Sequence, residues 1–213
     1  MISSRITETR AGVDDVRHVF TNRILENIRL ASSFSGKDLT VMESGIRALK
    51  RWTVRANANI IYDSRVDPFT DQGLFDKVEA KANVAIVAFT TEGDVFGGFY
   101  SVAVTEQWNA FFDENMFIFS FESHGRCETP KRFVVKAEER GRKYVMFFKN
   151  DSHGWFVMFG GAGGFCLENQ KSNTWYWNQS QGFDCIADTT LTGKPSGRPD
   201  HHRCSSLVAI QLD

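Results

Sequence analysis

The sequence lacks the features that mark membrane and secreted proteins. No segment approaches the roughly 18 uninterrupted apolar residues that a membrane span requires. The opening stretch MISSRITETRAGVDD has no apolar core of the kind found in secretion signals. Its second residue, Ile2, is not the glycine that myristoylation requires. We therefore expect a soluble, cytoplasmic protein with no transmembrane segment, which still leaves room for peripheral contact with a membrane.

The chain also has few cysteines and almost no net charge. The chain has four cysteines without any C-x-x-C pair, and its net charge is −1. Free buried thiols are therefore expected rather than disulfides. Nucleic-acid-binding domains usually carry a basic excess or a basic stripe, whereas the lysines and arginines here are scattered. This charge pattern disfavours DNA or RNA as a partner.

Phenylalanine, by contrast, is abundant. The chain has 19 phenylalanines, and 17 of them fall between Phe69 and Phe183. Aromatic side chains at this density suit the core of a large sheet, where flat rings pair across neighbouring strands.

The first 55 residues have the spacing of helices. Apolar residues recur at helical intervals over residues 14–34, and the sequence SGKD at 35–38 interrupts this pattern. A Thr-x-x-Glu capping box then predicts that a second helix opens at Thr40. Residues 1–55 are thus expected to form a helical arm or hairpin, which could pack on the following domain or mediate self-association.

Residues 56–213 have the spacing of strands. Short apolar runs alternate with turn residues, and a short helix with Leu74, Phe75 and Val78 inward interrupts them. The pattern predicts a mainly β (α+β) fold, a two-layer antiparallel β-sandwich flanked by short helices and preceded by the helical arm. The expected strands include a strand–turn–strand unit within 83–104 and further runs at 116–123, 132–138, 143–150, 155–160, 164–169 and 206–212, while 57–64 could be a strand or a helix end.

Two glycine-rich segments call for separate explanations. The stretch GWFVMFGGAGGFCLE at 154–168 could suggest a phosphate-binding loop, but the third glycine of a dinucleotide fingerprint falls on Cys166. The segment that follows resembles a strand, so no helix N-terminus would face a phosphate. We expect a glycine hairpin or bulge there and no cofactor. Within VFGGF at 95–99, the glycines predict close cover by a bulky aromatic, with Phe117, Phe119 and Trp155 as candidates.

Histidine and cysteine occur together in two places. HGRC contains His124 and Cys127, while HHRC contains His202 and Cys204. Two such pairs could form a zinc site with two thiolates and two imidazoles. The spacings are loose, and loop histidines beside unrelated cysteines are the simpler interpretation.

The remaining candidates for chemistry are weaker. Cys127 and Cys204 lie in polar, arginine-containing segments that could lower a thiol pKa, and no G-x-S-x-G elbow is present. The acidic run Asp63, Asp67, Asp71 and Asp76 lacks the spacing of a calcium loop, so a solvated turn region is expected.

Taken in order, the segments from about residue 48 onward resemble the TLDc domain family, especially members with a helical N-terminal arm. The matching segments are IIYDSRVDPF (60–69), LFDKV (74–78), VAIVAFTTEGDVFGGFYS (84–101), FIFSF (117–121), FGGAGGFCLE (159–168) and SLVAIQL (206–212). The motif residues are Tyr62, Ser64, Phe96, Gly97, Gly98, Phe119, Gly160, Gly161 and Phe165. The chain departs from the family pattern at Gln211 and in the loop at 190–204.

The resemblance implies a β-sandwich at 56–213 without an established catalytic site or cofactor. Relatives in this family are associated with oxidative-stress resistance, several bind the vacuolar proton-pumping ATPase (V-ATPase) and promote its disassembly, and some recognise phosphoinositides. The expectation is therefore a non-catalytic protein-interaction module with V-ATPase subunits as candidate partners. Two alternatives stay open: a thiol-dependent redox or hydrolytic enzyme, and a DNA-binding stress-response regulator.

Overall fold

A computed structural model describes most of the chain. The described residues are Phe34, 36–152, 154–161, 163–168, 179–187, 189–193 and 203–213. The helix expected over 14–34 lies outside them except for Phe34. The chain divides into two compact units, Met1–Glu43 and Ser44–Asp213, and the sheets belong to the second.

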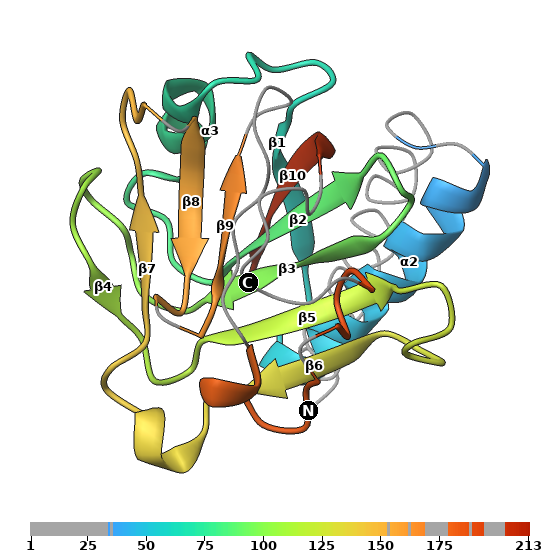
Figure 1. Cartoon of the computed structure of the whole chain (residues 1–213). Coiled ribbons are helices and arrows are strands. Elements are labelled where there is room, and N and C mark those ends of the chain that lie inside the picture. Colours follow the sequence, from blue (N-terminus) through green and yellow to red (C-terminus); the bar gives the residue numbers. More distant parts are fainter. Residues whose placement is uncertain are drawn as a thin grey trace, which may run out of the picture. The chain divides into compact units, whose positions relative to one another are not determined.

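The second unit is built on two antiparallel sheets (Figure 1). The larger, sheet A, has six strands in the order β1 (Ala58–Asp63), β10 (Cys204–Leu212), β2 (Val84–Thr90), β3 (Val95–Tyr100), β5 (Phe117–Glu122) and β6 (Lys131–Val134). The smaller, sheet B, has four strands in the order β4 (Phe111–Phe112), β7 (Tyr144–Phe147), β8 (Trp155–Phe159) and β9 (Phe165–Glu168). The predicted mainly β, two-layer antiparallel fold is confirmed, and residues 58–63 are a strand.

The main core lies where the inner faces of the two sheets meet. Phe96 of β3 packs edge-on against Phe165 of β9, with the ring centroids 5.3 Å apart. Tyr100 packs in the same way against Phe147 of β7, at 5.9 Å. Because successive residues of a strand point to opposite faces, the neighbouring Phe99 lies on the outer face, where it stacks on Phe117 at 4.8 Å. Both faces of β3 are covered, so its sequence is apolar throughout instead of alternating.

Helix α2 (Gly36–Thr53) begins earlier than the capping box predicted. Thr40 lies inside the helix, so the prediction of a helix start there was wrong. The first turn contains Asp38, whose negative charge is favourable near a helix N-terminus and allows the helix to begin upstream. A Thr-x-x-Glu pattern is also compatible with a helix interior, where it caps nothing.

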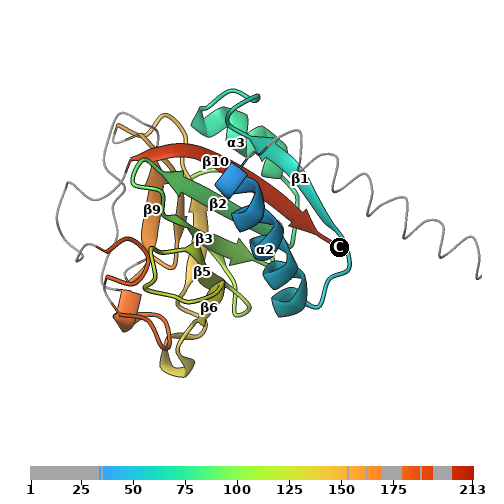
Figure 2. The same cartoon turned by 90° about the vertical axis from the view of Figure 1, so that its right-hand side faces the viewer.

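From Ser44 onward, α2 packs on the outer face of sheet A (Figure 2). Trp52 packs edge-on against Phe117 at 5.8 Å and lies 6.3 Å from the ring of Phe119. At Gly45 an added Cβ would lie 2.3 Å from Cδ2 of Phe121. The glycine therefore lets the helix backbone approach the aromatic rings of β5 closely.

Helix α3 (Asp71–Val78) has the predicted inward face, since Leu74, Phe75 and Val78 are all buried. Its N-cap residue is Thr70, whose Oγ1 accepts a hydrogen bond from the backbone N–H of Gly73 at 3.0 Å. This bond satisfies one of the N–H groups that have no partner within the helix. Three shorter elements were not predicted from the sequence: β4, the 3₁₀ turn η1 (Ala137–Glu139) and the 3₁₀ turn η2 (Gln179–Gln181).

The glycine-rich segment forms the turn between β8 and β9, as predicted. Phe159 pairs with Phe165 across the hairpin. Gly160 and Gly161 have φ values of +80° and +57°, which favour glycine. An added Cβ on Gly161 would also lie 2.8 Å from the Tyr144 ring. Backbone conformation and close packing therefore explain these glycines.

Candidate functional site

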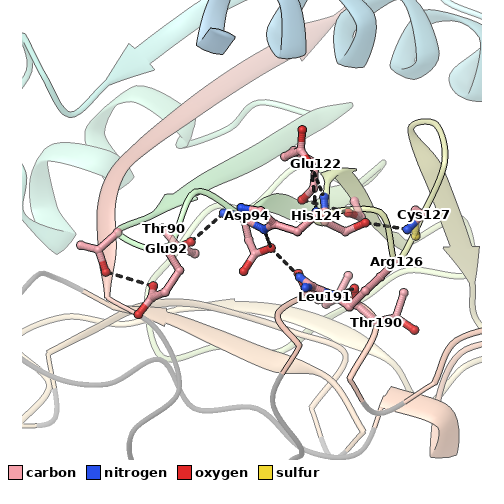
Figure 3. A network of polar contacts seen from close by, with 12 residues as sticks. Thr90, Glu92, Asp94, Glu122, His124, Arg126, Cys127, Thr190 and Leu191 are labelled. Carbon is pink, nitrogen blue, oxygen red and sulfur yellow. Dashed lines mark hydrogen bonds and ion pairs between the residues drawn. The ribbon is translucent and has the colours of Figure 1, made fainter.

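A connected cluster of polar side chains centres on Asp94 (Figure 3). Asp94 ends the turn between β2 and β3 and is only 2% exposed. Its backbone N–H donates to Oγ1 of Thr90 at 2.9 Å, and its carbonyl oxygen accepts from the N–H of Thr90 at 3.0 Å. These two bonds hold the turn closed and fix the position of the carboxylate.

Two side chains from the segment after β5 contact the Asp94 carboxylate. Nδ1 of His124 lies 2.9 Å from Oδ1 of Asp94, and Nη2 of Arg126 donates to the same oxygen. Arg126 also donates to the carbonyl oxygens of Thr190 and Leu191, at 3.1 and 3.2 Å. The cluster therefore fastens three separate segments to one another. A buried carboxylate needs such partners to offset the loss of hydration.

The first histidine–cysteine pair lies in a turn that belongs to this cluster. The backbone N–H of His124 donates to Oε1 of Glu122 at 2.8 Å, and the N–H of Cys127 donates to Oγ of Ser123 at 2.7 Å. The sequence HGRC is thus a hydrogen-bonded turn after β5, in which the His124 ring faces Asp94.

The second pair is placed differently from the sequence expectation. Cys204 was expected in a polar segment, but it is the first residue of β10, is fully buried and pairs with Thr90 of β2. His202 lies outside the described residues. The described parts of the chain contain no group of three or more His, Cys, Asp or Glu side chains placed to hold a metal ion.

Two motif residues of the opening segment have hydrogen-bonding roles. Tyr62 is fully buried in β1, and its hydroxyl donates to the carbonyl oxygen of Pro68 at 3.0 Å. Ser64 exchanges hydrogen bonds with Leu207 of β10: its N–H donates to the Leu207 carbonyl at 2.9 Å, and its Oγ accepts from the Leu207 N–H at 2.8 Å. Ser64 thus extends the pairing of β1 and β10 beyond the last residue of the strand.

The other motif residues lie in the sheets. Of the three aromatic residues expected to cover the glycines of β3, Phe119 does so: its Cζ would lie 2.8 Å from a Cβ on Gly97. Gly98 faces Phe159 of sheet B, which the sequence analysis did not name, and Trp155 covers neither glycine. The remaining motif residues, which contribute to the core or to the β8–β9 turn, are Phe96, Gly160, Gly161 and Phe165.

The acidic run is not simply a solvated turn, as was expected. Asp63 is 4% exposed and accepts two hydrogen bonds from the guanidinium of Arg65, at 2.8 and 2.7 Å. Burial acts to raise the pKa of Asp67, but the backbone N–H of Asp63 and the ammonium of Lys77 hold that pKa below its ordinary value. This segment is a structural turn tied by charge pairs.

The structure also reveals two exposed aromatic side chains at one edge of sheet B. Trp108 is 54% exposed and Phe112 is 57% exposed. The Trp108 indole N–H donates to the carbonyl oxygen of Lys149 at 3.0 Å, and its ring packs edge-on against Phe148 at 5.0 Å. Phe112 lies in the edge strand β4, where its ring is 5.6 Å from that of Tyr144. Neither was predicted from the sequence, because the exposure of one aromatic residue cannot be judged where aromatic residues are so frequent.

The family model of the TLDc domain matches residues 40–201. The chain belongs to the TLDc domain family. A search among curated proteins found no match. Strand β10 of this TLDc protein lies beyond the matched segment, although it pairs with both β1 and β2.

None of the described helices of the TLDc protein is both long and apolar enough to cross a membrane.

Proposed function

We propose that this TLDc protein is a non-catalytic protein-interaction module whose binding surface includes Trp108 and Phe112. The observation that carries the proposal is the exposure of two large aromatic rings along the same edge of sheet B. Exposed aromatic side chains cost free energy in water, and tryptophan is enriched among the residues that dominate binding energy in protein interfaces.

The two rings are held in place before any partner binds. The backbone N–H of Trp108 donates to the carbonyl oxygen of Phe147 at 2.7 Å, in addition to the bond made by its indole. The backbone of Phe112 is held by the pairing of β4 with β7, and its ring packs edge-on against that of Tyr144. Little side-chain freedom is therefore lost on association, which favours affinity.

For the partner, family resemblance suggests subunits of the V-ATPase, within a cytoplasmic response to oxidative stress. This part of the proposal rests on family membership, because sites and not folds determine function. The segment before the sandwich would, in the same role, allow two copies of the chain to associate.

The proposal is tested by pull-down of tagged chains from cells that contain a functional pump. The unmodified chain should recover pump subunits, and the double variant Trp108→Ala/Phe112→Ala should recover at least tenfold less, a loss in the range that hot-spot residues produce. Val66→Ser provides a matched control, because Val66 is 84% exposed in a different turn. Its recovery should equal that of the unmodified chain.

Two outcomes would contradict the proposal in different ways. If the unmodified chain recovers no pump subunit under conditions in which another TLDc protein does, the pump is not the partner. If the double variant recovers as much as the control, Trp108 and Phe112 are not the binding surface.

A further inference from the structure

A second surface feature, separate from the exposed aromatic rings, is a groove of about 360 Å³ beside the end of α2. Its floor is formed by outward-facing residues of β3 and β5, and its walls come from the end of α2, β6 and the segment around η1. Its volume lies within the range of ligand-binding pockets. The side chains that decide its chemistry are Arg55, Arg132, Arg140, Phe99, Met116 and Phe117.

The groove is strongly cationic. Three arginines, Arg55, Arg132 and Arg140, line it together with one carboxylate, Glu114, so the formal charge is three minus one, or +2. Among the described residues, none of these three guanidinium groups forms an ion pair, whereas Arg65 and Arg126 are each paired with a buried aspartate. Unpaired arginines gathered in one groove attract an anion from solution.

Arg132 is already positioned over the floor of the groove. Its guanidinium carbon lies 5.8 Å from the ring centroid of Phe117, and its Nη1 donates to the carbonyl oxygen of Trp52 at 2.8 Å. That carbonyl belongs to the last turn of α2, where the helix dipole is negative and would repel an anion. The contact with Arg132 offsets this repulsion. Within the described part of the chain the other N–H groups of this guanidinium have no acceptor, so they can donate to a ligand.

We propose that the groove binds a phosphate monoester attached to a ring or another apolar group. A phosphate dianion matches the net charge of the groove and can accept hydrogen bonds from several guanidinium groups at once. A carboxylate, by contrast, can be bound by a single guanidinium group. The rings of Phe99 and Phe117 and the side chain of Met116 provide an apolar floor for the rest of the ligand, and Ser101 and Asn115 add polar groups at its edge.

The same chemistry could be presented by a soluble molecule or by the headgroup of a membrane lipid. Phenyl phosphate represents the soluble form. Phosphatidylcholine vesicles containing phosphatidic acid, whose headgroup is a phosphate monoester, represent the lipid form. Vesicles containing phosphatidylserine provide the same type of negative surface with a phosphodiester instead.

The experiment measures binding of these probes to the full chain and to charge variants, by calorimetric titration for phenyl phosphate and by co-sedimentation for vesicles. Arg132→Gln and Arg140→Gln should each weaken binding by about tenfold or more, the effect of losing a charge-assisted hydrogen bond. Arg51→Gln is the matched control, since it removes the same charge from an exposed side chain of α2 that does not line the groove. Thermal unfolding of each variant shows that it is folded, and Arg140→Gln tests the site without altering the bond to Trp52.

Binding of phenyl phosphate that is lost in the two groove variants but not in the control supports the site with a soluble ligand. The same pattern with phosphatidic acid vesicles alone supports it with a lipid ligand. The proposal is overturned if neither probe binds, if the groove variants bind as well as the control, or if phenyl phosphate does not bind and phosphatidylserine vesicles bind as well as phosphatidic acid vesicles. The groove contains neither Trp108 nor Phe112, so this result is independent of the protein-interaction proposal.

Discussion

At the scale of the residue, Gly97 allows β2 and β3 to pair without distortion because it has no side chain. A Cβ at this position would lie 1.9 Å from the carbonyl oxygen of Ile86 and 2.8 Å from Cζ of Phe119. The first of these atoms belongs to the backbone of the neighbouring strand, which cannot rotate away as a side chain can.

We therefore expect Gly97→Ala to lower the free energy of unfolding by about 1–3 kcal/mol, the usual cost of overpacking a core. Gly125→Ala is a useful comparison, because a Cβ at Gly125 would meet nothing within 4 Å and only its φ of +82° opposes the change. Urea unfolding of the two variants should place Gly97→Ala as the less stable. The reverse order would show that the two strands can separate at low cost.

A second residue-scale prediction concerns acid. The pKa of Asp67 is lowered in the folded state, so its ionised form stabilises the fold above the ordinary pKa of an aspartate. This stabilisation is lost as the pH falls through the lowered pKa, because the folded state must then take up the proton as well. The stability difference between the unmodified chain and Asp67→Asn should therefore be constant above the ordinary pKa of an aspartate and shrink as the pH falls below it.

Unfolding by urea at several pH values measures this difference. Asp76→Asn serves as a control for the loss of one carboxylate in the same region, since Asp76 is an exposed residue of helix α3. A difference that stays constant down to strongly acidic pH would contradict the role given to Asp67.

At the scale of the element, α2 shows how local helix preference and packing can act against each other. Replacing a glycine inside a helix would normally stabilise that helix, by about 1 kcal/mol for alanine. Gly45, however, faces the ring of Phe121, and any side chain there would separate the helix from β5.

Gly45→Val is accordingly expected to destabilise the protein by about 1–3 kcal/mol through this clash. Arg47→Ala, at an exposed position of the same helix, should change stability little. Thermal unfolding compares the two variants, and hydrogen exchange of the amides from Ser44 to Thr53 should be faster in Gly45→Val. Equal exchange in both variants would mean that the helix can shift along the sheet without cost.

Elements also differ in how well the sequence predicts them. The long runs of β2, β3, β5 and β10 were predicted because both faces of sheet A are covered, which leaves uninterrupted apolar segments. Strand β4 has two residues, too few for any periodicity. The start of α2 was predicted wrongly because Thr-x-x-Glu fits a helix interior as well as a helix start.

At the scale of the whole molecule, the sequence predicted the two-sheet fold and the family but neither of the two proposed binding surfaces. Exposure of Trp108 and Phe112 depends on where one sheet ends. The cationic groove unites arginines from the end of α2, from β6 and from the end of η1, which are far apart in the chain. Such a cluster arises only from the folded arrangement, since no local pattern in the sequence links the three.

The position of β10 has a consequence for how the protein is made. This strand lies between β1 and β2 in sheet A, although the chain reaches it after every other strand (Figure 1). While the chain emerges from the ribosome, β1 and the facing edge of β2 have no neighbour to pair with, and such open edges are prone to pair with other chains. Sheet A is therefore completed by the insertion of a strand between two others, and a chain cut short of Cys204 leaves two unpaired edges for quality control to recognise.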